Sequence, residues 1–275
     1  MKPVNPMGGV HAARILLSGM LVAVLAGYIS GAEADSLSDL RTVLQGLDAS
    51  TEIKGTLDVQ SIKLNPKQDD KQKDTKQTPP AQLQLAIDAG EGLGIHLSPA
   101  LLQRIDAEQQ AKAENPEQPT PTADLLGEVG PMEIERIVSV APGLSRALDG
   151  AEAVASKQTE LDGAQVQELS MKLPFKASKE ERSNISDYRG GMTIWLDAKG
   201  VPLAYQQTFH GKFCKFFLCV TVDETRDGKL QIVAGRLIAT SYIDESKQSG
   251  LGQDGDSKRI YNLDLENTSD ARQNK

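Results

Sequence analysis

The chain has 275 residues, a formal net charge of -8 at pH 7 and 25% charged residues. A chain of this length can bury a sizeable core, either as one large domain or as two small ones. Its acidic balance argues against binding to nucleic acid or to an anionic membrane surface through bulk electrostatics.

The N-terminal segment has the pattern of a cleavable secretion signal. Basic residues precede an apolar run from Ile15 to Ile29, and Ala32-Glu33-Ala34 supplies the small-x-small pattern of a signal-peptidase site. The alternative is a membrane anchor, but a spanning helix needs about 20 apolar residues and this run has 15. We therefore expect a signal peptide over residues 1–34, a periplasmic protein, and no membrane span after cleavage.

The first part of the mature chain combines a helix pattern with strand patterns. Leucines at three- and four-residue spacing predict a helix over 35–47, and alternation with period two predicts a strand over 52–64. Two further strands are expected within 82–97, joined by a short turn. Between the first two strands, residues 66–80 contain no large apolar side chain, so we expect a mobile polar insertion there.

Helices are expected in the middle of the chain. Ser98-Pro99 combines a capping hydroxyl with a proline suited to the first helical turn. Three prolines within 114–122 predict the end of that helix. A second helical stretch starts near Met132, and Pro142-Gly143 should split it near Val138, because a proline ring collides with the carbonyl four residues earlier.

The remainder of the chain has strand patterns with turn residues between them. The expected strands cover 151–161, 165–174, 192–197, 201–209, 212–224, 229–243 and 259–265. Turns are expected at Asp162-Gly163, at Asp197 to Gly200 with Gly200 left-handed, and at Arg226-Asp227-Gly228. The order of elements predicts an α+β fold: one domain over 35–265, with a large antiparallel sheet, helices on one side, and a disordered tail over 266–275.

No group of residues in the sequence forms a recognisable catalytic or metal-binding motif. The mature chain has only two histidines, His96 and His210, and neither lies in a nucleophile or ligand pattern. The segment GLGQDG, Gly250 to Gly255, matches a phosphate-binding glycine pattern, but a strand pattern follows it where that site needs a helix. We therefore expect no enzyme, no metal and no cofactor.

The two cysteines, Cys214 and Cys219, favour a disulfide. On one straight strand they would lie about 17 Å apart, whereas a disulfide needs α-carbons within about 7 Å. The chain must therefore turn or bulge between them, although KFFL contains no turn-forming residue. An oxidising compartment favours the bond.

The arrangement of elements resembles a known family. The opening helix, KGTLDV at Lys54 to Val59, the helices in mid-chain, and the segments DGAQVQELSMKLP and GMTIWLDAKGVPLAYQQ are similar to the half-barrel superfamily of periplasmic outer-membrane lipoprotein carriers. This resemblance covers about two thirds of the mature chain. It implies a curved antiparallel half-barrel with a cleft for a lipid or hydrophobic ligand, and it supplies no functional residue.

Within that cleft, Trp195, Leu203 and Tyr205 are the candidate ligand-contacting residues. Trp195 shares a strand face with Thr193 and Asp197 and could line the concave side, although burial in the core is the commoner role of a large aromatic side chain. Two functions stay open. One is binding of a lipid or lipoprotein without catalysis; the other is an envelope interaction or structural protein, with a filled core and a protein partner.

Overall fold

The computed structural model describes residues 29–47, 51–64, 81–90, 92–176, 178, 182, 184–215, 218–250 and 255–266. Residues 1–28 of the expected signal peptide, the expected polar insertion 66–80, and residues 267–275 of the expected tail lie outside these ranges. Within them, no helix combines the length and apolar character needed to cross a bilayer.

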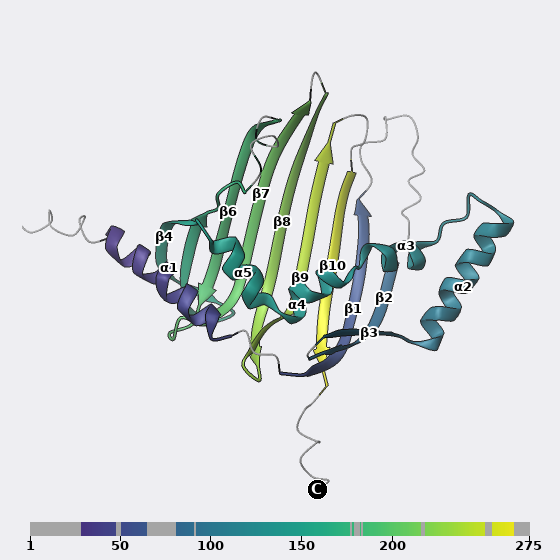
Figure 1. The fold of residues 1–275 in the computed structure, drawn as a ribbon, viewed down its shortest axis with the longest axis horizontal. Coiled ribbons are helices and arrows are strands. Elements are labelled where there is room, and N and C mark those ends of the chain that lie inside the picture. Colours follow the sequence, from purple (N-terminus) through teal and green to yellow (C-terminus); the bar gives the residue numbers. More distant parts are fainter. Residues whose placement is uncertain are drawn as a thin grey trace, which may run out of the picture.

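The central element is one open sheet of ten antiparallel strands, in the order β3-β2-β1-β10-β9-β8-β7-β6-β5-β4 (Figure 1). The strands are β1 (Ile53–Leu64), β2 (Ala81–Ala89), β3 (Leu93–Leu97), β4 (Glu152–Leu161), β5 (Ala164–Lys172), β6 (Ile185–Leu196), β7 (Pro202–Lys215), β8 (Leu218–Val233), β9 (Arg236–Ser249) and β10 (Gly255–Leu265). The edge strands β3 and β4 do not pair with each other, so the described sheet is not a closed barrel. The chain is therefore an α+β protein, as predicted.

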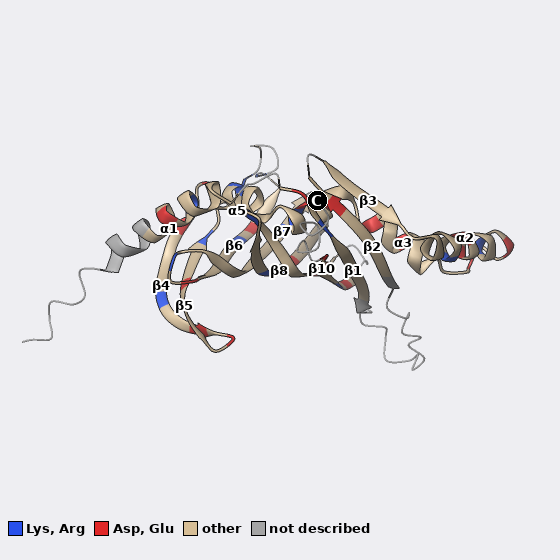
Figure 2. Cartoon of the chain, turned by 90° about the horizontal axis from the view of Figure 1, so that it is seen from below, with Lys and Arg blue, Asp and Glu red and all other residues tan. Residues whose placement is uncertain are grey.

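Five described helices accompany the sheet. They are α1 (Ile29–Gln45), α2 (Pro99–Glu114), α3 (Pro121–Glu128), α4 (Pro131–Val138) and α5 (Val140–Leu148). Helices α1, α4 and α5 cross one side of the sheet, α3 contacts β2, and α2 extends past the β3 edge and packs on α3 (Figure 1). No described helix covers the opposite side (Figure 2). We call the covered side the helix face and the other side the outer face.

The main core lies between the helices and the helix face, because strand residues there are apolar at every second position. Leu57 and Val59 of β1 are fully buried, whereas the intervening Asp58 is only partly buried. Leucines and isoleucines from α1, α4 and α5 fill the opposite side of this layer. The largest buried apolar side chains include Leu40, Leu44, Leu83, Leu85, Ile134, Ile137, Leu148 and Leu169.

The predicted helices are confirmed, with one additional helix. Ser98 caps α2, its Oγ accepting from the N–H of Leu101 at 3.2 Å, and the split near Val138 separates α4 from α5. Helix α3, within the proline-rich region, was not predicted. It starts at Pro121, where a proline suits the first turn, and carboxylate oxygens of Glu108 accept from the N–H groups of Thr122 and Ala123.

Two of the predicted turns are confirmed and one is wrong. Asp162 and Gly163 have φ of 51° and 83° between β4 and β5, and Gly200 has φ of 77° between β6 and β7. The predicted turn at 226–228 is instead the middle of β8, and the chain turns at Ala234-Gly235. Gly228 marks a close approach: a Cβ there would collide with the ring of Tyr205, directly opposite on β7.

The predicted strand over 212–224 is also wrong, because the chain reverses between Lys215 and Leu218. This reversal places Cys214 opposite Cys219, with α-carbons 4.1 Å apart, and the two form a disulfide with an S–S distance of 2.12 Å. The predicted disulfide is confirmed. It indicates an oxidising location outside the cytoplasm, where such bonds persist.

Candidate functional site

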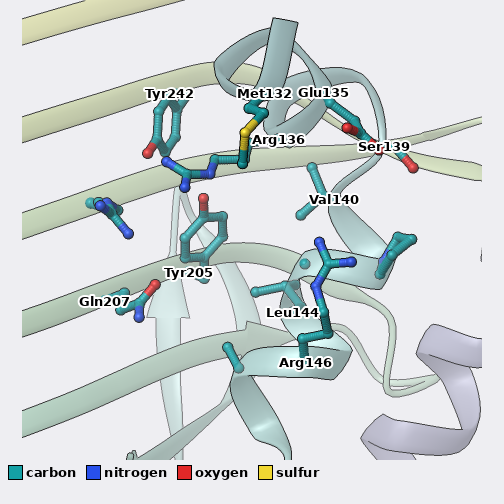
Figure 3. A pocket seen from close by; sticks show the side chains of 14 residues that line it. Met132, Glu135, Arg136, Ser139, Val140, Leu144, Arg146, Tyr205, Gln207 and Tyr242 are labelled. Atoms are coloured by element: carbon teal, nitrogen blue, oxygen red, sulfur yellow. The ribbon is translucent and has the colours of Figure 1, made fainter. Parts of the chain in front are cut away.

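A pocket lies between helices α4 and α5 and strands β7 to β9 of the helix face. Its volume is about 580 Å³, within the range of about 300–1,000 Å³ typical of ligand sites. Figure 3 shows side chains from both layers directed into this space. The lining residues are Met132, Glu135, Arg136, Ser139, Val140, Pro142, Gly143, Leu144, Arg146, Ala147, Tyr205, Gln207, Arg226 and Tyr242.

The floor of the pocket is formed by two adjacent rows of residues that run across the strands. One row, which we call the tyrosine row, contains Tyr205, Gly228, Tyr242 and Tyr261 in direct register across β7, β8, β9 and β10. The next row, which we call the polar row, contains Gln207, Arg226, Asp244, Arg259 and Ser61, the last on β1. Each strand from β7 to β9 therefore places two consecutive helix-face positions at or beside the pocket.

The two tyrosines of the pocket floor are deeply buried. Tyr205 is 7% exposed and Tyr242 is 1% exposed. Burial disfavours the phenolate and raises the pKa of Tyr205 to about 12, against weaker opposing effects of Arg226 and Arg136. Burial also raises the pKa of Tyr242 above its ordinary value. Both side chains are therefore neutral at pH 7, with hydroxyl groups that can donate a hydrogen bond.

Buried polar atoms without a hydrogen-bond partner are concentrated in these two rows. Among the described residues there are five such side-chain atoms: Ser61 Oγ, Arg226 Nε, the Tyr242 hydroxyl, Asp244 Oδ1 and the Tyr261 hydroxyl. Most buried polar groups in proteins have a partner, because leaving one unpaired costs about 1–3 kcal/mol. The unpaired Tyr242 hydroxyl and Arg226 Nε belong to pocket-lining residues, which marks this part of the floor as a place for polar ligand atoms.

Charged groups around the pocket are mostly paired. Nη2 of Arg226 donates to Glu224 at 3.0 Å, and Nη1 of Arg136 donates to Glu133 at 2.8 Å. Burial acts to lower the pKa of Arg226, but Tyr242 and the neighbouring carboxylates outweigh it and raise that pKa. Arg146, which is exposed, makes no ion pair within the described part of the chain.

The helix side of the pocket carries both apolar and charged residues. Val140, Leu144 and Ala147 of α5 line it, and Met132 of α4 is 70% exposed. Glu135, Arg136, Ser139 and Arg146 also line this side, so the lining is amphipathic. Such a lining suits a ligand with an apolar body and a polar end.

The structure brings one of the three candidate residues into the pocket. Tyr205 lines the floor. Trp195 lies directly opposite Ala204, on the outer face and partly buried, and Leu203 is partly buried but does not line this pocket. The cysteines lie at the far end of the β7–β8 hairpin.

The two histidines lie apart from the pocket. His96 is on the edge strand β3. His210 is on the outer face, where Nδ1 lies 2.6 Å from Asp223 Oδ1 and Nε2 lies 3.3 Å from Asp187 Oδ2. No cluster of three metal-ligating side chains occurs in the described ranges. After the glycine-rich segment at 250–255, Gly255 begins strand β10, so a strand follows that segment, as predicted.

Sequence reasoning missed Arg136, Arg226 and Tyr242. A signal for Tyr242 existed, because three strands each carry a tyrosine two positions from a polar residue: Tyr205 with Gln207, Tyr242 with Asp244, and Tyr261 with Arg259. Residues two apart share a strand face. The wrong turn at 226–228 removed Arg226 from its strand, and so concealed the polar row.

The chain matches no protein-family model, and comparison with curated proteins also gives no match.

Proposed function

We propose that this protein is a non-catalytic envelope protein, exported to the periplasm, that binds a lipid or another hydrophobic ligand in the pocket beneath α4 and α5. The observation that carries the proposal is a pocket of about 580 Å³ with apolar α5 residues on one side and, on its floor, a tyrosine hydroxyl that is buried without a partner. The disulfide supports export. The proposed ligand is a lipid or the lipid part of a lipoprotein.

A second candidate function is supported by a different surface. Four aromatic rings outside the pocket form a row in which each contacts the next. The ring centroids are 4.6 Å apart from Phe175 to Tyr188, 5.6 Å from Tyr188 to Phe209 and 6.3 Å from Phe209 to Phe213. All four side chains are only partly buried. Aromatic residues are enriched in protein interfaces, so this surface fits a protein partner and an interaction role.

Filling the pocket tests the ligand-binding function. Gly143 lines the pocket, and a Cβ there would meet no atom within 4 Å, so Gly143→Phe should occupy the space without a backbone clash. Gly127 of α3 offers a matched control, because a Cβ there is equally unobstructed and the residue does not line the pocket. Thermal unfolding would establish that both variants remain folded.

The measurement is native mass spectrometry of protein purified gently from the periplasm. We expect the wild-type protein and Gly127→Phe to carry a mass in the lipid range that is released on denaturation, and Gly143→Phe to lose it. Equal lipid content in the two variants, or a wild-type protein that neither carries nor takes up lipid, would contradict ligand binding in this pocket. The second result would favour the interaction role, with the aromatic surface as the first region to crosslink.

A further inference from the structure

We infer that the ligand of this pocket is a single-chain amphiphile with an oxyanion head group, and that the head group is bound at the tyrosine hydroxyls beside Arg136 and Arg226. This inference rests on the proposed function and specifies its ligand class. A fatty-acid carboxylate and the phosphate of a monoacyl lipid share the required chemistry: negatively charged oxygens at one end of an acyl chain.

The pocket floor offers hydrogen-bond donors to a ligand. The Tyr242 hydroxyl is buried and unpaired, and Nε of Arg226 is a buried N–H without a hydrogen-bond partner. Asp244 Oδ1, at 3.7 Å, is within ion-pair range of that Nε but too distant for a hydrogen bond. Oxyanions accept hydrogen bonds from such donors, and these charge-assisted bonds are about twice as strong as neutral ones.

Most of the charged side chains that line the pocket are cationic. Three of the four charged residues that line the pocket are arginines, although the whole chain has a net charge of -8. The fourth, Glu135, lies beside Ser139 and away from Tyr242, whereas Arg136 extends toward the two tyrosines (Figure 3). Arg146 adds a guanidinium that no described carboxylate pairs with. Arg136 and Arg226 are each paired with a glutamate, so the preference for an anionic head group comes from Arg146 and from the Nε of Arg226, which has no hydrogen-bond partner.

The wall opposite the floor contributes apolar residues to the pocket. Val140 and Leu144 of α5 are buried apolar residues that face the same space. Met132 extends the apolar surface to solvent, since its side chain is largely exposed. An acyl chain lying on Val140 and Leu144 of α5 would keep its methylenes on apolar groups while its head group reaches the tyrosine row. A fully polar anion would leave this wall without a complementary surface.

Calorimetric titration of the mature protein with dodecanoate, dodecyl phosphate and dodecanol tests the inference. The three probes share one chain length and differ in the head group. We expect both anions to bind about tenfold or more tighter than dodecanol, because each should gain at least one charge-assisted hydrogen bond. The tighter of the two anions would identify the head group as carboxylate or phosphate.

Two tyrosine variants localise the head group. Tyr242→Phe should weaken binding of the anions about tenfold. Tyr261→Phe is the matched control: its hydroxyl is also buried without a partner and lies in the same row, but the residue does not line the pocket. Arg146→Gln should weaken the anions and leave dodecanol unchanged, and added salt should reduce that difference.

The outcomes separate the inference from the proposed function. Equal affinity for dodecanol and the anions, or equal effects of Tyr242→Phe and Tyr261→Phe, would overturn the assigned head group while the pocket remains a ligand site. Failure of all three probes to bind, together with unchanged lipid content in Gly143→Phe, would overturn both.

Discussion

Two regions of the helix face lie side by side and differ in how completely their buried groups are satisfied. On β1, Leu57 is fully buried among apolar neighbours, including Leu85 and Leu263 directly opposite it. Four positions along the same strand, Ser61 is also buried, at 7% exposure, but its hydroxyl has no partner. Two regions with similar burial therefore differ in their contribution. The first stabilises the fold, whereas the second contains buried polar groups without partners, which is typical of a functional site.

The largest effect should come from the apolar region. Leu57→Ala removes a fully buried side chain and leaves a cavity, so we expect the free energy of unfolding to fall by about 3 kcal/mol. Urea unfolding would measure it. Val154, which is 61% exposed on the edge strand β4, provides the control, and Val154→Ala should cost less than about 0.5 kcal/mol. Equal losses in the two variants would contradict the location of the core.

A smaller loss is expected in the polar row. Asp244, 5% exposed, accepts from Arg259 Nη2 at 2.9 Å and lies beside Arg226. Asp244→Asn leaves both guanidinium groups without this charge, and because each arginine is partly solvated we expect a loss of about 2 kcal/mol rather than the 3–5 of a fully buried pair.

The control for this prediction is Asp187→Asn on the outer face. Asp187 is exposed and lies 3.4 Å from Arg189 and 3.3 Å from His210 Nε2, so its substitution should change the free energy of unfolding by less than about 0.5 kcal/mol. An Asp244→Asn protein as stable as wild type would mean that the polar row makes no contribution to folding through its charges.

The difference between these regions also shows which features the sequence could predict. Apolar alternation on β1 predicts both the strand and its buried face, because each position depends only on its neighbours along the chain. The polar row depends on register across five strands, so no single strand contains it. The sequence predicted a chain reversal at Gly228, where the glycine instead leaves room for the ring of Tyr205, and it predicted a continuous strand over 212–224, where the chain reverses between Lys215 and Leu218.

Alkaline pH should distinguish the tyrosine row from the apolar region, which contains no titrating group. Burial raises the pKa of Tyr205 and of Tyr261 to about 12, above the ordinary value of 10. The unfolded chain releases these protons first, so the stabilisation is complete below pH 10 and is lost as the pH rises toward 12.

At pH 11 each of these tyrosines should lower the free energy of unfolding by about 1 kcal/mol relative to pH 9. Urea unfolding at the two values would show it. The double variant Tyr205→Phe and Tyr261→Phe should flatten this dependence by roughly the summed amount, whereas Tyr188→Phe, partly exposed on β6, should flatten it less. A wild-type protein equally stable at both values would contradict the assigned burial.

The smallest expected effect is the change in the free energy of unfolding caused by Tyr242→Phe, and its sign tests whether the Tyr242 hydroxyl stabilises the fold. The Tyr188 hydroxyl donates to the backbone oxygen of Pro174 at 3.2 Å, so Tyr188→Phe should cost about 1 kcal/mol. The Tyr242 hydroxyl has no partner, so in ligand-free protein Tyr242→Phe should cost nothing or stabilise by up to about 1 kcal/mol. Urea unfolding of delipidated protein would compare them.

A loss equal to that of Tyr188→Phe would mean that the Tyr242 hydroxyl is satisfied inside the fold, and the tyrosine row would then be core. A gain in stability, combined with weaker binding of dodecanoate, would show that this hydroxyl opposes folding and serves the ligand.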